Sequence, residues 1–103
     1  MTPQREEALR LLRLARRDRE TFDLLLPLQK AGLAALGFHA QQASEKALKA
    51  VAVLLGLEVP CTHDLAALGQ AILDHGTTLP LTVDQLRGLN PFAVEYRYDD
   101  ELI

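Results

Sequence analysis

Residues 33–55 read LAALGFHAQQASEKALKAVAVLL, an unbroken helical pattern that contains no proline and ends before Gly56. At about 100° per residue, eight apolar side chains of this run fall on one arc. They are Leu33, Leu36, Ala40, Ala43, Ala47, Ala50, Val51 and Leu54. The many alanines on this arc predict that another helix packs closely against it. The opposite arc carries Phe38, Gln41, Gln42, Glu45, Lys46 and Lys49.

The sequence before this run predicts another long helix, from Pro3 to about Leu26. Thr2 is a suitable N-cap and Pro3 suits the first turn, whereas Pro27 and Gly32 indicate a break. The apolar residues of this helix share one broad face: Ala8, Leu11, Leu12, Leu14, Ala15, Phe22 and Leu25. Because the two long helices have similar lengths and a short connection, we expect them to form an antiparallel pair.

Two shorter helical segments follow. Thr62 is a good N-cap for a helix over residues 63–75, which stops at Gly76. A fourth helical region begins near Thr82, and Asn90-Pro91 is expected either to start a second piece or to kink the helix. The predicted fold class is therefore all-α, an up-and-down bundle of four main helices. We expect one domain that spans residues 1–103.

The composition limits the class of protein. A chain of 103 residues, 49% of them apolar, suits a small core, so marginal stability or oligomerisation is expected. The net charge of -3 gives no general attraction to nucleic acid or anionic membranes. Neither a signal peptide nor a run of about 18 apolar residues is visible, so we expect a cytoplasmic protein. The single cysteine excludes an internal disulfide, and no histidine pair has metal-ligand spacing, so no metal or other cofactor is expected.

Asp18 does not fit a plain amphipathic helix, because it falls in the centre of the apolar arc of the first helix. A charge at a core-facing position is costly unless it is paired. One interpretation is an organised polar site with a basic partner: Arg97 is the first candidate, and Lys46 and Lys49 are alternatives. The other interpretation is a local bend, or a rim position that is open to water.

The polar arc of residues 38–49 also allows two interpretations. Glu45 and Lys49 have i,i+4 spacing, as do Gln42 and Lys46, which is typical of a solvated helix face. Phe38 lies on the same arc, and an aromatic side chain there favours a surface that contacts a ligand or a partner.

Arg97 lies between Tyr96 and Tyr98. An arginine among aromatic residues suits stacking and anion recognition. It could equally be a surface residue that is neutralised by Asp99 and Asp100.

Four stretches resemble the HEPN family of prokaryotic helical bundles. Residues 38–50, FHAQQASEKALKA, resemble the family's central helix. Residues 60–65, PCTHDL, are similar to its Pro-x-Thr-His-Asp-Leu motif, and residues 92–98, FAVEYRY, to its final aromatic-Ala-Val stretch that ends in Arg-Tyr. Arg17-Asp18 matches a common Arg-Asp pair of the first helix. The stretches occur in the family's order and cover nearly the whole chain.

The resemblance implies a bundle that commonly dimerises and has nucleotide- or RNA-related biology. Such proteins often pair with a minimal nucleotidyltransferase, in toxin–antitoxin-like modules. Carried over by position, a ligand- or partner-binding groove is lined by Asp18, Gln42, Glu45, Lys46, Lys49 and Arg97. The expected function is therefore a non-catalytic binding and assembly module. We expect a homodimer that binds a nucleotidyltransferase or a nucleotide, and RNA is a less expected partner.

Two departures from the family pattern bear on activity. Ribonuclease members carry a His four to six residues after the Arg, but residues 98–103, YDDELI, contain no His. No catalytic residue is therefore expected, and the alternative is a metal-independent ribonuclease that uses His39 or His63. A third hypothesis is a structural dimer whose polar arc is only solvated. Family members also often have a further helix after Arg-Tyr, so a naturally short protein and a truncated chain both fit the sequence.

Overall fold

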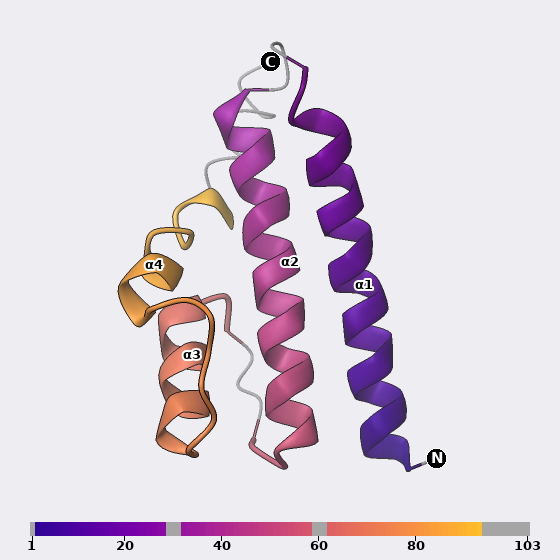
Figure 1. The fold of residues 1–103 in the computed structure, drawn as a ribbon, viewed down its shortest axis with the longest axis vertical. Coiled ribbons are helices and arrows are strands. Elements are labelled where there is room, and N and C mark those ends of the chain that lie inside the picture. The colour runs from indigo at the N-terminus through magenta and orange to yellow at the C-terminus, as the bar shows by residue number, and fades with distance from the viewer. Residues whose placement is uncertain (1, 29–31, 59–61, 94–103) are drawn as a thin grey trace.

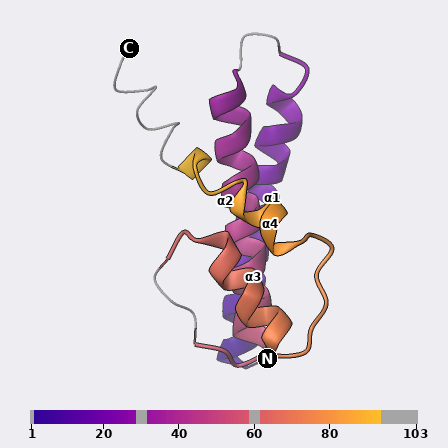
Figure 2. The same ribbon diagram turned by 90° about the vertical axis from the view of Figure 1, so that its left-hand side faces the viewer.

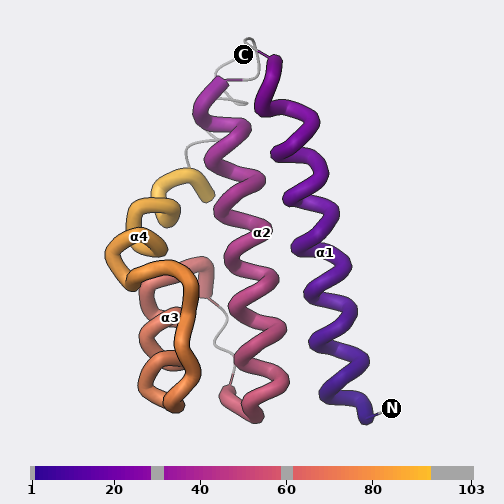
Figure 3. Tube along the Cα trace, viewed as in Figure 1, coloured from indigo at the N-terminus to yellow at the C-terminus, as the bar shows by residue number. Residues whose placement is uncertain are grey.

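The computed structural model describes residues 2–28, 32–58 and 62–93. Within these residues the chain forms four helices and no strand, which confirms the all-α prediction: α1 (Pro3–Leu25), α2 (Leu33–Leu54), α3 (Leu65–Asp74) and α4 (Val83–Arg87). The long helices α1 and α2 are antiparallel neighbours, as predicted (Figure 1). On the other side of α2 lies α3, with α4 packed on it; the turned view and the Cα trace show the same order (Figures 2 and 3). The central helix is therefore α2.

Local capping rules explain where most helices begin. The Thr2 hydroxyl accepts a hydrogen bond from the backbone N–H of Arg5 at 3.2 Å. At the start of α4, Thr82 and Gln85 form a capping box in which each side chain accepts from the other residue's backbone N–H. Both starts agree with the sequence prediction.

The start of α3 differs from the prediction, because Asp64 and not Thr62 is its N-cap. The Asp64 carboxylate accepts from the backbone N–H groups of Ala66 and Ala67, at 3.0 and 3.3 Å. The Thr62 hydroxyl instead accepts from the N–H of Asp64, two residues on, and so shapes the turn before the helix. His63 therefore precedes α3 and does not lie in its first turn.

Asn90 fixes the start of α3 from a distant part of the chain. Its side-chain oxygen accepts from the backbone N–H of Leu65, and its side-chain nitrogen donates to Asp64, both at 2.9 Å. The side chain thus joins the segment after α4 to the N-terminus of α3. The helical piece predicted after Pro91 lies mostly outside the described residues, which end at Ala93.

The main core lies where α2, α3 and α4 meet. It is formed by buried Leu48, Leu65, Leu68, Ile72 and Leu86. A smaller cluster of Ala8, Leu11 and Ala50 joins α1 to α2. The small side chains of Ala8 and Ala50 allow the two long helices to approach closely.

The two predicted apolar arcs are only partly buried. In the first helix Ala8, Leu11 and Ala15 are buried, but Leu12 is exposed. In α2, Ala50 is buried as predicted, whereas Leu33 and Leu54 are 73% and 51% exposed. Leu33 and Leu54 are the first and last residues of α2, whereas the residues between them on this arc are buried or half-buried.

Gly37 lets the segment after α4 pack against α2. The ring of Phe92 occupies the space that a Cβ atom at position 37 would need. We predict that Gly37→Ala lowers the free energy of unfolding by about 1 kcal/mol, since overpacking of about 1–3 kcal/mol exceeds the gain in helix propensity. Urea denaturation measures this.

The matched comparison is Gly37→Ala in a Phe92→Ala background. With the ring gone, the added methyl group should be neutral or stabilising. Equal destabilisation in both backgrounds would contradict the packing explanation.

Candidate functional site

Asp18 is paired with two residues of α2. Lys46 Nζ donates a hydrogen bond to Asp18 Oδ2, and His39 Nδ1 lies 3.1 Å from Asp18 Oδ1. The Asp18 side chain is only 14% exposed. The polar-site interpretation of Asp18 is therefore the one that the geometry supports, and the bend or open rim is not needed to explain it.

The partner of Asp18 is a residue that was predicted only as an alternative. Lys46 forms the pair, while Lys49 is bound to Glu45 instead. Arg97, the first candidate, lies outside the described residues. His39 was not predicted, although its spacing of seven residues from Lys46 puts both on one helix face.

Among the described residues of the expected groove, Glu45 is the most buried charged side chain, with 6% of its surface exposed. Three side chains surround it: Gln41 at 3.0 Å, Lys49 at 3.1 Å and His63 Nδ1 at 2.7 Å. Gln42 donates in turn to the side-chain oxygen of Gln41 at 2.7 Å. Among the described residues no buried side-chain nitrogen or oxygen lacks a partner.

The simpler interpretation predicted that the polar arc of α2 is a solvated face. The structure differs from it, because part of this arc is buried. Gln41 and Glu45 are buried, and Gln42, Lys46 and Lys49 are half-buried. Of the two predicted i,i+4 pairs, Glu45–Lys49 is present, whereas Gln42 and Lys46 bind other residues. Helical periodicity alone does not give burial, and one partner of Glu45, His63, comes from the chain segment before α3.

The pKa of Glu45 lies below its ordinary value despite burial. Burial alone would raise this pKa, since it disfavours the charged form. Hydrogen bonds from His63, Gln41 and Lys49, together with the charge of Lys49, outweigh that effect. The folded protein therefore favours an ionised Glu45.

The position of His63 depends on the start of α3. His63 immediately precedes Asp64, whose carboxylate caps α3 and accepts from Asn90. The Asn90 side chain, followed by the backbone N–H bonds, also lowers the pKa of Asp64, so this cap stays ionised. A fixed cap holds the adjacent imidazole against Glu45.

His39 and His63 are each oriented by a carboxylate. An ionised carboxylate only accepts hydrogen bonds, so Nδ1 of His39 and of His63 must carry the hydrogen. Such pairing fixes the tautomer of each ring. The His63 side chain is 64% exposed and can meet solutes.

A basic hollow lies on α1 next to Asp18. Arg10, Arg13, Leu14 and Arg17 line a concavity of about 410 Å³. Leu14 and Arg17, which line the hollow, precede Asp18 by four residues and one residue on α1, but neither Asp18 nor Lys46 lines it. Arg10 is bound to Glu7 at 2.7 Å, but Arg13 and Arg17 form no ion pair with other described residues. The hollow therefore carries positive charge that is not neutralised locally.

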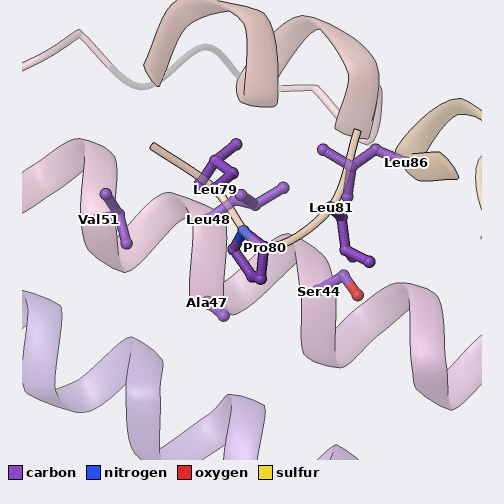
Figure 4. Close-up of a pocket in the computed structure, with 8 residues that line it drawn as sticks. All are labelled: Ser44, Ala47, Leu48, Val51, Leu79, Pro80, Leu81 and Leu86. Atoms are coloured by element: carbon purple, nitrogen blue, oxygen red, sulfur yellow. The ribbon is translucent and has the colours of Figure 1, made fainter. Parts of the chain in front are cut away.

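A second hollow is apolar and lies on another side of α2. Its volume is about 210 Å³, and Figure 4 shows its lining: Ser44, Ala47, Leu48, Val51, Leu79, Pro80, Leu81 and Leu86. None of these side chains is charged, so this hollow offers no recognition of a phosphate or carboxylate.

Within the described residues, no three His, Cys, Asp or Glu side chains are grouped to hold a metal ion. In the same part of the chain, no helix has both the length and the apolar content to span a bilayer.

Comparison with known proteins gives one match. The family model described as HEPN domain matches residues 8–102. This range includes every residue of the expected groove, Arg97 among them. No curated protein and no solved structure matches the chain.

Asp18→Ala should lower the free energy of unfolding by about 2 kcal/mol, because it leaves Lys46 half-buried without its carboxylate partner. This cost lies between those typical of breaking an exposed ion pair and a fully buried one. Chemical denaturation of Asp18→Ala, Lys46→Ala and the double variant measures the coupling between them. Asp23→Ala is the matched control, because Asp23 is exposed and pairs loosely with Arg19. Equal costs for Asp18→Ala and Asp23→Ala would contradict the prediction.

Glu45 should contribute stability that disappears in acid. Its folded-state pKa is below the ordinary value of 4.5, so the contribution is complete above pH 4.5 and is lost as pH falls through the lowered pKa. Melting temperatures of the wild type and Glu45→Gln, measured from pH 6 down to about pH 2.5, should therefore converge as the pH falls. A constant difference over this range would show that ionisation of Glu45 is not the cause.

Proposed function

Because the chain belongs to the HEPN domain family, we propose that it is a non-catalytic binding and assembly module. In this proposal a homodimer binds a nucleotide, or a nucleotidyltransferase partner, in the polar groove. The groove residues are Asp18, Gln42, Glu45, Lys46, Lys49 and Arg97. A toxin–antitoxin-like context is part of the proposal and comes from the family resemblance alone.

The observation that carries the proposal is the basic hollow beside the Asp18–Lys46 pair. In the polar network Asp18 and Glu45 balance Lys46 and Lys49, so these four side chains supply no net charge. Arg13 and Arg17 add positive charge next to that network. Arginine binds phosphate and carboxylate oxygens through several N–H groups, so an anionic group of the ligand is expected there.

The network itself supports binding through preorganisation. Lys46 and Gln42 are each held by one hydrogen bond to a neighbouring side chain, so little side-chain freedom remains to be lost on binding. The attraction of an anionic ligand is confined to the groove and the adjacent arginines. The net charge of -3 means that the protein as a whole repels a polyanion. A compact nucleotide or a protein surface suits such a site better than a long RNA.

A ribonuclease is the second candidate, and the Glu45–His63 contact favours it. A carboxylate-oriented imidazole that is largely exposed has the character of a general base. Cleavage also needs charge at the phosphate in the transition state, which the arginines could supply. The missing His after Arg97 still makes binding without cleavage the main proposal.

Calorimetric titration with ATP tests the binding proposal. We predict binding that weakens roughly fivefold in Arg17→Ala, since one charge-assisted contact is lost at a partly solvated site. Arg16→Ala is the matched control, because Arg16 is on the same helix but does not line the hollow.

Co-expression with a neighbouring minimal nucleotidyltransferase, where the genome encodes one, tests the partner. If neither ATP nor that protein binds, the proposal fails.

Incubation with labelled RNA separates the two candidates. The binding module should cleave no more RNA than its Arg97→Ala variant. Cleavage that is abolished by His63→Ala or His39→Ala would instead favour the ribonuclease.

A further inference from the structure

The buried carboxylate of Glu45 is shared by a lysine and a histidine. Lys49 Nζ donates to Oε2 at 3.1 Å, and His63 Nδ1 lies 2.7 Å from Oε1. We call these three residues the Glu45 unit. One lysine is enough to balance the charge of one carboxylate, so neutralisation of Glu45 does not require the histidine. The imidazole therefore brings a further property to this part of the groove.

The same arrangement occurs at Asp18, where Lys46 binds Oδ2 and His39 Nδ1 lies 3.1 Å from Oδ1. The two histidines differ in exposure. The His39 side chain is 21% exposed, and its ring packs edge-on against Phe38 with the centroids 5.3 Å apart. The His63 side chain is 64% exposed. The Glu45 unit is therefore the one whose ring a solute can reach.

The atom of His63 that a ligand meets is Nε2. Nδ1 carries its hydrogen toward the buried carboxylate, so the exposed part of the ring includes Nε2. A neutral ring has a lone pair at Nε2, which cannot bind an anionic oxygen. A ring that has taken up a proton has an N–H donor there instead. One proton thus converts this position into a charged donor of the kind that binds phosphate oxygens.

The charged groups around this ring come from several elements. Glu45 and Lys49 belong to α2, and Asp64 is the N-cap of α3, next to the ring in sequence. Arg87 of α4 is bound to Asp84, and its charge also acts on Asp64. Asp64 in turn accepts from backbone N–H groups at the positive end of α3. Within the Glu45 unit the lysine balances the carboxylate, so a proton on the ring gives the unit one net positive charge.

We propose that the Glu45 unit is a proton-dependent anion subsite, in which protonated His63 and Lys49 bind one phosphate oxyanion of the ligand. The inference rests on the nucleotide binding of the proposed function and adds a pH dependence to it. Lys49 has three N–H donors, so it can bind the anion while it also binds Glu45. Anion binding and proton uptake by the ring favour each other, because such coupling is reciprocal. Binding is therefore tight at low pH and weakens as the ring loses its proton.

The subsite differs in this respect from the hollow on α1. Arginine keeps its charge at every pH at which proteins are folded, so the contact of Arg17 with an anion does not depend on its own titration. Histidine is the side chain whose charge ordinarily changes between pH 5 and 8. The two contributions to binding can therefore be separated by pH.

Calorimetric titration with ATP at about pH 5.5 and about pH 8 tests the subsite. His63→Gln keeps an N–H group that can donate to Glu45 but cannot take up a proton. It should weaken binding roughly fivefold at the lower pH, where a charge-assisted contact is lost, and have little effect at the higher pH. Both values lie above the lowered pKa of Glu45, so its carboxylate stays ionised. ATP also titrates in this range, but its change is common to all variants and cancels in the ratio of dissociation constants.

Two matched controls use the same titrations. His75→Gln removes an exposed histidine at the C-cap of α3, outside the Glu45 unit, and should leave ATP binding unchanged at both pH values. Arg17→Ala should weaken binding by the same factor at both pH values, because arginine does not titrate. Circular dichroism checks that each variant is folded.

Nitrogen-15 NMR of the histidine side chains measures the proton in the wild type, without any substitution. With ATP bound, His63 should keep its proton to a higher pH than in the free protein. His75 should titrate alike with and without ATP.

The outcomes separate this inference from the proposed function. A His63→Gln factor that is the same at both pH values, or a His63 titration that does not respond to ATP, would reject the subsite. If Arg17→Ala still weakens ATP binding in that case, the proposed binding function stands. A wild type that does not bind ATP at either pH would reject nucleotide binding and the subsite together.

Discussion

The buried carboxylate of Glu45 is the constraint on which the arrangement of the other elements depends. A buried charge without partners would be strongly destabilising, so the fold must bring donors to it. Two of them, Gln41 and Lys49, come from α2 itself and follow from helical spacing. The third, His63, comes from the chain before α3 and is held by the Asp64 cap and by Asn90. The docking of α3 on α2 and the polar network therefore support each other.

The sequence predicted the helices well because their ends depend on local chemistry. Thr2 and Thr82 are N-caps and Pro3 is the first residue of α1, as the sequence indicated. Thr62 and Asp64 are both good caps two residues apart, and local rules did not decide between them. The choice of Asp64 comes with Asn90, which is 26 residues further along the chain and binds the same carboxylate. Such a contact depends on tertiary structure and is not visible in local spacing.

Prediction of the candidate site was partial for a similar reason. Asp18 stood out because a charge among apolar residues needs a partner, and this argument holds whatever the partner is. Naming the partner required the register of α1 against α2, which periodicity does not supply. The same limit explains why Gln41 and Glu45 were assigned to a polar arc but not recognised as buried. Helical periodicity gives directions around one axis, whereas burial depends on which neighbours occupy each direction.

The buried polar network of α2 has a cost in stability. Replacing such a network by apolar side chains is often neutral or stabilising, so its presence suggests a functional role. In a chain of 103 residues it also takes space that an apolar core could fill. The central helix thus gives up apolar packing on one face, and the proposed binding role of that face offers a reason for this loss.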